Sequence, residues 1–495
     1  MDKSCDLVLI DEVNIKFDGL DPKTRAIMIK ACEYFVPYAR HTPAYKLGRW
    51  DGRVSFMNMG GGTFFHLLDR LFPILDEFKY SINLIDSRKY KQEYEFNEID
   101  ETFFGNVLFP KGHFKEGEPI ILRPHQVAAV NGYLKNRHAT EVISTGGGKT
   151  LITAALSKCI EVYGRSIVIV PSKDLVTQTE ADYRLVGLDV GVFFGERKEL
   201  NHKHTICTWQ SLIALQRRER NETLGLTDVD LEEFTRDVVC LMCDEAHTIK
   251  GTELKQFLGQ GSMANIPLRW GMTGTIPKDE IEALQIRCNI GDIVHSVAAS
   301  DLQELGVLSK CSINICQMVN NLKFPSYAEE MNWLVTNKLR IQYISSMIKE
   351  ISTTGNTLVL VNNIETGEQL RDNLGLGKDL FVSGSTVKAK RKEQYDSIDS
   401  SENKILIATY GVCSTGISIN RIFNVVLIEP GKSFVKVIQS IGRGLRMAKD
   451  KDSVLIYDIC GSNKYSAKHM RERVTFYKEA NYPHNITKID NWENK

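Results

Sequence analysis

The residues with the clearest chemical meaning lie in the segment Glu141-Val-Ile-Ser-Thr-Gly-Gly-Gly-Lys-Thr150. An apolar stretch runs into three glycines and then into Lys149 and Thr150. Glycines let backbone N–H groups approach an anion, and the N-terminus of a helix favours negative charge. The lysine can reach terminal phosphates, and the threonine hydroxyl can ligate Mg²⁺. We therefore predict a phosphate loop and nucleotide hydrolysis. The predicted loop comprises Ser144, Thr145, Gly146, Gly147, Gly148, Lys149 and Thr150.

One position departs from the full pattern G-x-x-x-x-G-K-[ST], because Ile143 stands where its first glycine would be. A glycine-rich turn before a surface lysine is therefore the alternative interpretation. The residues that follow, up to Ile160, carry apolar side chains at helical spacing. Strand, loop and helix thus come in the order that a phosphate loop needs.

A second group of chemical residues follows the apolar run Asp237–Cys243, which has the pattern of a buried strand. This run delivers Asp244-Glu-Ala-His247, and in open parallel sheets the chemistry sits at the C-terminal ends of strands. We assign Asp244 to Mg²⁺ and Glu245 to the attacking water. The alternative is that Asp244 only caps a helix.

A pair of arginines lies in the segment Gln439-Ser-Ile-Gly-Arg-Gly-Leu-Arg446. Arg443 and Arg446 are three residues apart and share one face of a helical turn, an arrangement that suits the charge on a γ-phosphoryl group. The alternative is a solvated basic helix face. Two glycines within the segment argue against it, since each costs about 1 kcal/mol relative to alanine in a helix.

The remaining pattern predicts the elements that must hold these residues. From about residue 116, short apolar runs alternate with helical stretches, and the alternation repeats after about residue 310. Before residue 116 the chain looks like a small α+β unit, with a hairpin expected at Asp51-Gly52 between Tyr45–Trp50 and Arg53–Met59. The predicted domains are 1–115 (α+β), 116–300 and 301–462 (doubly wound α/β), and 463–495 (a helical extension).

Composition narrows the classes of protein. The 495 residues contain 62 lysines and arginines and 62 acids, so any nucleic-acid surface must be local. Eleven scattered cysteines suit a reducing cytosol. No apolar run approaches the ~20 residues that span a membrane. We expect a cytoplasmic protein, in the host cell if it is viral, and favour a monomer.

Six motifs occur together in one order. They are Arg123-Pro-His-Gln126, the phosphate loop, Asp244–His247, Met272-Thr-Gly-Thr275, Ser414-Thr-Gly-Ile-Ser418 and Gln439–Arg446. This set resembles the superfamily 2 helicases and translocases over residues 116–460. Within that superfamily the chain is similar to the UvsW-type branch-migration helicases of tailed phages. That similarity rests on Gly48–Arg53, Thr208–Ser211 and Tyr410–Ser418.

The resemblance implies a fold class and a set of roles. The fold is α/β, with two tandem RecA-like doubly wound parallel-sheet domains, a small N-terminal α+β domain and a C-terminal helix. ATP and Mg²⁺ are the implied cofactors. The implied adenine-binding residues are Arg123 and Gln126. Thr273 and Thr275 would couple hydrolysis to domain movement. Positions implied around the rest of the nucleotide are Gly416, Ser418, Gln439, Arg443 and Arg446, with the last two as arginine fingers.

The resemblance also implies nucleic-acid contacts, at Pro171, Ser172, Thr208 and Thr415. Hydroxyls and N–H groups there would contact the phosphate backbone. Arg49 and Arg53 are candidate duplex contacts in the N-terminal domain. The basic residues Arg217, Arg218 and Arg220 fit a solvated helix face better than a DNA contact.

The implied function is an ATP-dependent DNA helicase or translocase on branched or forked duplexes, with a single strand in the motor cleft. Its outputs would be branch migration, fork regression, and processing of Holliday junctions or RNA–DNA hybrids in R-loops. Three alternatives stay open: an RNA helicase, the motor subunit of a restriction system, and an ATP-gated clamp that does not translocate.

Overall fold

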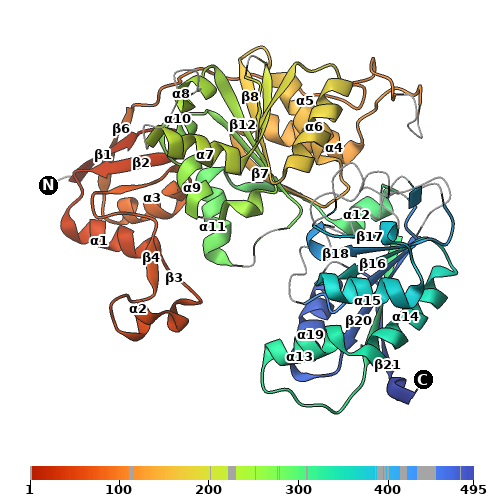
Figure 1. Cartoon of the computed structure of the whole chain (residues 1–495). Coiled ribbons are helices and arrows are strands. Elements are labelled where there is room, and N and C mark those ends of the chain that lie inside the picture. Colours follow the sequence, from red (N-terminus) through yellow and green to blue (C-terminus); the bar gives the residue numbers. More distant parts are fainter. Residues whose placement is uncertain are drawn as a thin grey trace. The chain divides into compact units, whose positions relative to one another are not determined.

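The structure is a computed structural model in which most of the chain can be described (Figure 1). The described residues are 3–110, 116–200, 202–220, 230–250, 252–275, 277, 279–307, 310–384, 386, 394, 397–398, 401–412, 421–431, 453–479 and 481–494. By its internal contacts the chain divides into two compact units. Unit 1 holds Met1–Ile143 and Gly148–Ser296, and unit 2 holds Ser144–Gly147 and Val297–Lys495.

Unit 1 begins with a four-stranded sheet in the order β5-β2-β1-β6. The bounds are β1 Lys3–Leu9, β2 Asn14–Asp18, β5 Gly62–Phe64 and β6 Tyr80–Asp86. In β1 the side chains of Cys5, Leu7 and Leu9 are buried in alternation, as expected of a strand with one face on a core. The helices beside it are α1 Pro22–Ala31, η2 Phe65–Leu67 and α3 Leu68–Glu77.

An arm, residues 33–55, extends from this part of unit 1 (Figure 1). It consists of β3 Glu33–Phe35, η1 Ala39–His41, α2 Pro43–Lys46 and β4 Arg53–Ser55. The expected hairpin is wrong in one respect, because the partner of β4 is β3, while Tyr45–Trp50 is not a strand. The reason is local: Pro43 occupies the first turn of α2, and the Thr42 hydroxyl accepts a hydrogen bond from the N–H of Tyr45.

The centre of unit 1 is an eight-stranded sheet in the order β10-β9-β11-β8-β12-β13-β7-β14. Every described pairing in it is parallel except that of β10 with β9. The strands are β7 His138–Ile143, β8 Arg165–Val170, β9 Val190–Phe194, β10 Arg197–Lys198, β11 His204–Thr208, β12 Val238–Asp244, β13 Leu268–Thr273 and β14 Ile293–Val297. The helices are α4 Pro124–Leu134, α5 Lys149–Ile160, α6 Lys173–Leu185, α7 Trp209–Arg220, α8 Leu231–Phe234, η3 Ala246–Lys250, α9 Thr252–Leu258, α10 Gly261–Ala264 and α11 Glu280–Asn289.

Unit 2 contains a seven-stranded sheet in the order β17-β18-β16-β19-β20-β15-β21, and all its described pairings are parallel. The strands are β15 Lys310–Met318, β16 Thr357–Val361, β17 Phe381–Val382, β18 Ile405–Thr409, β19 Asn424–Ile428, β20 Ser453–Gly461 and β21 His484–Ile489. The helical segments are α12 Ala299–Glu304, α13 Tyr327–Thr336, α14 Lys338–Ser352, α15 Ile364–Leu374, η4 Lys378–Leu380, α19 Lys464–Glu479 and η5 Trp492–Asn494.

The predicted fold class is confirmed, since two largely parallel α/β sheets follow one another and a small α+β part precedes them. Apolar strands are buried on both faces, as in β12, where Val238 to Cys243 are all buried. The sequence reasoning missed β21, which follows the expected C-terminal helix and extends the second sheet beside β15.

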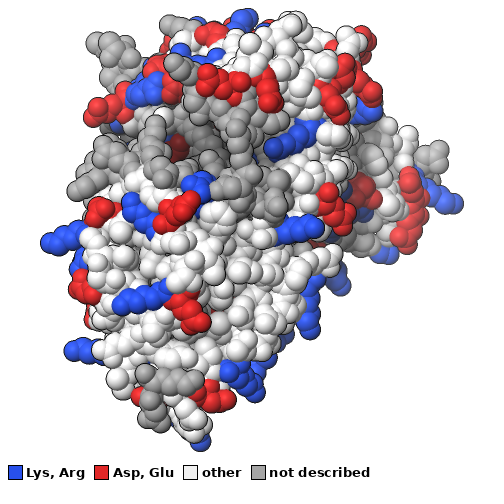
Figure 2. Space-filling model, turned by 90° about the vertical axis from the view of Figure 1, so that its right-hand side faces the viewer, with Lys and Arg blue, Asp and Glu red and all other residues white. Residues whose placement is uncertain are grey.

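Three general features accompany this fold. In the described part of the chain, no helix has the length and apolarity needed to cross a bilayer. The ten described cysteines are all free thiols, and nine of them are buried. Acidic and basic side chains are interspersed on the face drawn in Figure 2, in keeping with their equal numbers in the sequence.

One buried carboxyl lies in β7, just before the predicted phosphate loop. Glu141 is fully buried, and neither of its carboxylate oxygens has a hydrogen-bond partner. The Nδ1 atom of His295 in β14 lies 3.7 Å from Oε2 of this carboxyl. Burial raises the pKa of Glu141 to about 9. The folded protein therefore holds this group as a neutral acid at neutral pH.

We expect the variant Glu141→Gln to become more stable relative to the wild type as pH rises. The pKa of Glu141 in the folded protein is raised from 4.5 to about 9. The contribution of this group to the free energy of unfolding is therefore fully present below pH 4.5 and is lost as pH rises towards 9. The amide does not titrate, so the difference in unfolding free energy should grow by up to about 1.4 kcal/mol per pH unit. Unfolding midpoints of both proteins at pH 5.5 and pH 8 test this. Glu77→Gln, on an exposed carboxyl, is the control, and an unchanged difference between the two pH values would contradict the assignment.

Candidate functional site

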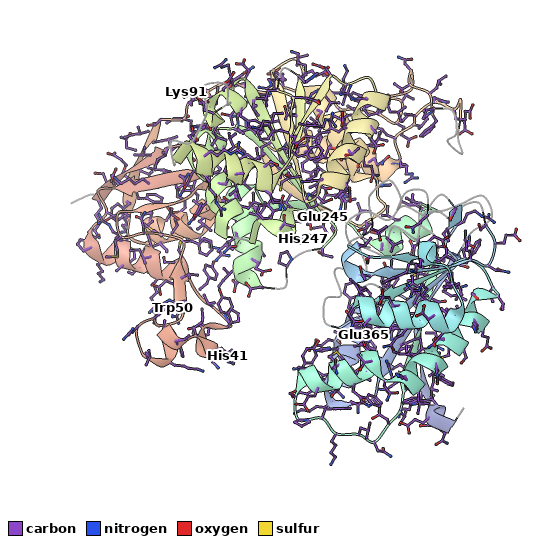
Figure 3. All side chains as sticks on the ribbon, in the orientation of Figure 1. His41, Trp50, Lys91, Glu245, His247 and Glu365 are labelled. Atoms are coloured by element: carbon purple, nitrogen blue, oxygen red, sulfur yellow. The ribbon has the colours of Figure 1, made fainter. Side chains whose placement is uncertain are left out.

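Three neighbouring strands of unit 1 deliver the predicted chemical residues to one edge of the sheet. β12, β13 and β7 are adjacent and parallel, with Asp244 opposite Met272 and Thr273 opposite Val142. Because parallel strands end on the same side, Asp244, Thr273 and the start of the phosphate loop meet at that edge. Figure 3 shows Glu245 and His247 there together.

The phosphate loop joins β7, which ends at Ile143, to α5, which begins at Lys149. Gly148 is the N-cap of α5, and it adopts a left-handed backbone conformation with φ of 79°. A Cβ atom at this position would lie 2.2 Å from the Nε2 atom of Gln126. Glycine is therefore required here for two reasons, its backbone angle and the close approach of Gln126. No side chain caps α5, and the N-terminus of such a helix favours a bound anion.

A continuous chain of polar contacts connects the three motifs. The Lys149 ammonium donates a hydrogen bond of 2.9 Å to Oε1 of Glu245 and lies 3.8 Å from Oδ1 of Asp244. The other carboxylate oxygen, Oε2 of Glu245, lies 3.3 Å from Nδ1 of His247. The same nitrogen is 3.0 Å from the hydroxyl of Thr273. That hydroxyl in turn donates to the carbonyl of Thr275 at 2.8 Å.

The backbone at Glu245 is held in an unusual conformation. Its φ is 53°, in the left-handed region that non-glycine residues seldom enter, and its N–H donates to Oδ1 of Asp244 at 2.9 Å. Such backbone strain occurs mainly at functional sites, where surrounding contacts maintain it. Here the strained turn places the Glu245 carboxylate on Lys149.

The protonation state of Glu245 follows from its neighbours. Burial alone would raise the pKa of this carboxyl, but the charge of Lys149 and the hydrogen bond from His247 outweigh it and hold the pKa well below its usual range. Glu245 is thus ionised at neutral pH. An ionised carboxylate at this position can orient a water molecule and accept its proton.

The start of α4 holds the two residues predicted to recognise adenine. Oε1 of Gln126 accepts a hydrogen bond of 2.9 Å from the N–H of Arg123, which fixes the Gln126 side chain at the N-terminus of α4. Its Nε2 atom donates to the carbonyl of Gly148 at 3.4 Å. Gln126 is buried, whereas Arg123 is exposed. The structure thereby links this segment directly to the phosphate loop.

Thr150 and Asp244 supply the oxygen donors that Mg²⁺ prefers. Among the described residues there is no cluster of three or more His, Cys, Asp and Glu side chains that could hold a metal ion. A magnesium ion at this edge would therefore take the rest of its ligands from nucleotide phosphates and water, which is how Mg²⁺ commonly binds.

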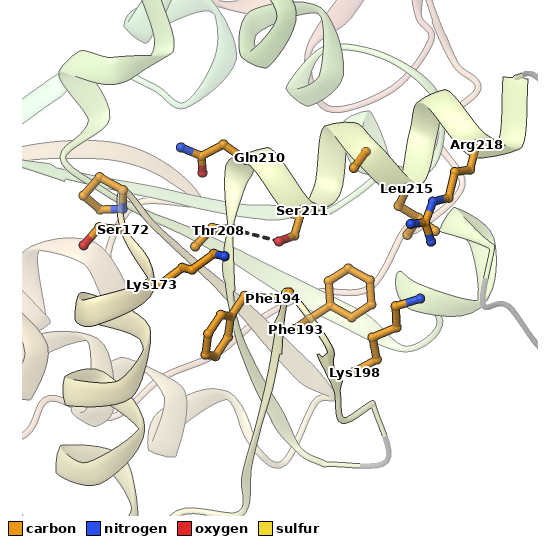
Figure 4. Close-up of a pocket in the computed structure, with 13 residues that line it drawn as sticks. Ser172, Lys173, Phe193, Phe194, Lys198, Thr208, Gln210, Ser211, Leu215 and Arg218 are labelled. Carbon is orange, nitrogen blue, oxygen red and sulfur yellow. Dashed lines mark hydrogen bonds between the residues drawn. The ribbon is translucent and has the colours of Figure 1, made fainter. Parts of the chain in front are cut away.

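The predicted nucleic-acid residues fall in two places. Pro171, Ser172 and Thr208 line one hollow of about 460 Å³, which we call the Phe194 pocket (Figure 4). It is defined by Ser172, Lys173, Phe194, Thr208, Leu215 and Arg218. Arg49 and Arg53 lie elsewhere, exposed on the arm, where His41 and Trp50 are labelled in Figure 3.

The remaining predicted residues lie outside the described part of the chain. They are Thr415, Gly416, Ser418, Gln439, Arg443 and Arg446. Their roles at the nucleotide and the nucleic acid stay predictions.

Comparison with known proteins places this geometry in a family. The family described as "Type III restriction enzyme, res subunit" matches residues 119–278, and the one described as "Helicase conserved C-terminal domain" matches residues 339–448. The chain is 26% identical over 445 residues to the ATP-dependent DNA helicase uvsW of Enterobacteria phage T4, covering 86% of this chain and 84% of that protein. The chain is a superfamily 2 helicase.

Two further known proteins are similar to this chain. The helicase is 28% identical over 229 residues to the DNA 3'-5' translocase XPB2 of Sulfurisphaera tokodaii, covering 46% of this chain and 45% of that protein. Its fold matches the ATP-dependent Type ISP restriction-modification enzyme LlaBIII with a TM-score of 0.56 at 13% identity, covering 86% of this chain and 36% of the other. That likeness concerns the fold alone. Membership in the family makes the protein an ATP-hydrolysing helicase.

Sequence reasoning did not include several residues of the helicase that the structure brings beside the predicted nucleic-acid positions. Lys173, Phe194 and Lys198 line the same pocket as Ser172 and Thr208. Arg218, which the sequence favoured as part of a solvated helix face, also lines it. A signal was present, because Ser211, Leu215 and Arg218 share one face of α7 by their spacing.

We expect two substitutions in the helicase to separate catalysis from nucleotide binding. Glu245→Gln removes the proton acceptor, so ATP turnover should fall by about 10²-fold or more while nucleotide binding persists. Lys149→Ala removes a phosphate contact, so both nucleotide affinity and turnover should fall. The measurements are steady-state phosphate release and equilibrium binding of a fluorescent ATP analogue.

The control for this pair is Glu77→Gln, an exposed carboxyl on α3, which should behave as the wild type. If Glu245→Gln hydrolysed ATP at the wild-type rate, the assignment of the water-activating group would be wrong.

Proposed function

We propose that this helicase is an ATP-driven motor that moves along DNA and acts on branched or forked duplexes, in the cytoplasm of an infected host. The proposal of a motor is supported by the chain of polar contacts from Lys149 through Glu245 and His247 to Thr273. It connects the group that would bind the γ-phosphate to the segment that follows β13. A change at the phosphate can therefore reach a second loop through direct contacts.

The hydrolytic step follows from the groups at this edge. The N-terminus of α5 and the Lys149 ammonium would bind the terminal phosphates of ATP. Glu245 would orient the attacking water and accept its proton, because its carboxylate is ionised and held in place. Thr150 and Asp244 would hold Mg²⁺, which neutralises charge on the phosphates. Arg123 and Gln126, at the start of α4, would contact the adenine ring.

Coupling would run through His247, whose Nδ1 atom contacts both Glu245 and Thr273. When the Glu245 carboxylate gains a proton, it loses its negative charge, and its contact with the His247 ring is weakened. The Thr273 hydroxyl, which also bonds to Thr275, is then free to rearrange. Movement of this segment would shift the grip on the nucleic acid.

Two observations support DNA as the nucleic acid along which the protein moves. This chain is similar to relatives named as a DNA helicase and a DNA translocase, and the similarity to the DNA helicase covers 86% of this chain. The arm presents Arg49 and Arg53 to solvent on the same compact unit as the ATP-binding residues. Exposed guanidiniums on a protruding hairpin suit phosphate contacts with duplex arms.

We expect the wild-type protein to displace strands from forked DNA and four-way DNA junctions only with ATP and Mg²⁺. ATPase and strand displacement are measured side by side on forks, four-way junctions, R-loops and RNA duplexes, with Glu245→Gln as the inactive control. Equal activity on RNA duplexes would overturn the branched-DNA proposal in favour of an RNA helicase. ATP-dependent binding to forks without any displaced strand would indicate a clamp.

We expect the double variant Arg49→Ala/Arg53→Ala to bind forked DNA more weakly, with a larger loss on forks than on single strands. If each arginine neutralises one phosphate, the slope of log K against log salt concentration should fall by about two. Lys16→Ala, which removes a surface lysine paired with Asp18 on the N-terminal sheet, is the matched control. An unchanged slope would exclude the arm from the DNA contact.

A further inference from the structure

The Phe194 pocket has properties that a contact to backbone phosphates alone does not require. Its volume of about 460 Å³ falls in the range of ~300–1,000 Å³ that small-molecule pockets occupy. A phosphate needs only a shallow cluster of donors. This hollow is large enough for a planar ring as well.

The pocket has an apolar interior and a basic rim. Phe193, Thr208 and Leu215 are buried lining residues, and Phe194 is half-buried beside them. Lys173, Lys198 and Arg218 are exposed at its edge, and the lining includes no carboxylate. Figure 4 shows the Phe193 and Phe194 rings and the three basic side chains grouped around the hollow.

Local structure fixes the polar side of this pocket. Ser172 is the N-cap of α6, and its hydroxyl accepts from the N–H of Leu175 at 3.3 Å. The hydroxyls of Thr208 and Ser211 are hydrogen-bonded to each other at 2.9 Å. Lys173 forms no ion pair with any carboxylate in the described part of the chain. The Lys173 ammonium lies near Gly195, because a Cβ atom added at that glycine would be 3.9 Å from the ammonium nitrogen.

These features match one nucleotide of a single strand. Aromatic rings bind unpaired bases by stacking, and basic groups around such rings track the flanking phosphates. We propose that the Phe194 pocket takes up one unstacked nucleobase, with the neighbouring phosphates bound by Lys173, Lys198 and Arg218. The proposal rests on the proposed function, because it needs a single strand on unit 1, and it adds a base-binding seat to the phosphate contacts expected at Ser172 and Thr208.

A base seat has a consequence that phosphate contacts lack: binding depends on the presence of a base at one position. The test uses the wild-type protein without ATP, so that it does not move, on a duplex with a short single-stranded tail of either polarity. A single abasic nucleotide is placed at each tail position in turn. The expected result is a loss of affinity of about fivefold or more at one position, or at two adjacent ones, and little change elsewhere.

Substitutions identify the seat. Phe194→Ala should weaken binding to the intact tail by a similar factor and flatten the abasic scan, whereas Phe194→Tyr, which keeps the ring, should preserve both. Phe194→Leu keeps apolar volume without a ring and should resemble the alanine variant, which separates stacking from a folding defect. Arg218→Gln should lower the salt slope by about one, and Arg184→Gln, at the other end of α6 and paired with Glu180, should leave it unchanged.

The outcomes distinguish a failure of the base-binding proposal from a failure of the proposed function. Tight binding to the tail with a flat abasic scan in the wild type would overturn the base seat and leave the motor intact. A position-dependent loss that survives Phe194→Ala would place the base elsewhere and would also overturn it. Failure of the wild type to bind any tail, with or without a base, would contradict the proposed function itself.

Discussion

The ion pair between Lys149 and Glu245 is the contact on which the rest of the site depends. It joins the loop after β7 to the turn after β12, although these segments are about a hundred residues apart in the chain. The parallel register of β7, β13 and β12 makes the contact possible, because it brings three strand ends to one edge. The left-handed turn at Glu245 then directs its carboxylate to the lysine.

The N-terminal part of the helicase is held to this machinery by a shared helix. On α11, Leu284 and Cys288 pack into the core of the N-terminal sheet. Ile286, and Ile290 directly after the helix, pack into the core beneath the eight-stranded sheet. One helix thus contributes to two cores through opposite faces. Polar contacts add to this, including the ion pair of Arg287 with Asp69 and the hydrogen bond between His66 and His138. The arm is therefore attached to the same unit that carries Lys149, Asp244 and Glu245.

The sequence predicted correctly where the pattern is local. The apolar runs predicted the buried parallel strands, and the glycine segment lies between a strand and a helix in the predicted order. It was insufficient where pairing is non-local. The pairing of β4 with β3 passes over the seventeen residues between them, 36–52, and no short-range turn signal reports it.

Two further omissions have the same origin. β21 is an edge strand whose residues are mostly exposed, so it lacks the apolar alternation that reveals a strand. The Phe194 pocket combines β9, α6 and α7, and the role of Phe194 emerges only when these elements meet. Residues such as Gln126 are a mixed case: the motif named it, but only the structure explains why Gly148 beside it can carry no side chain.

The central claim is that the contact between His247 and Thr273 transmits events at the phosphate to the segment after β13. A double-mutant cycle on DNA-stimulated ATP hydrolysis, with His247→Ala, Thr273→Val and the double variant, tests it most directly. If the two side chains act as one link, the double variant should turn over ATP as fast as the slower single variant. A loss equal to the product of the two single losses would show that they act independently, and would contradict the account.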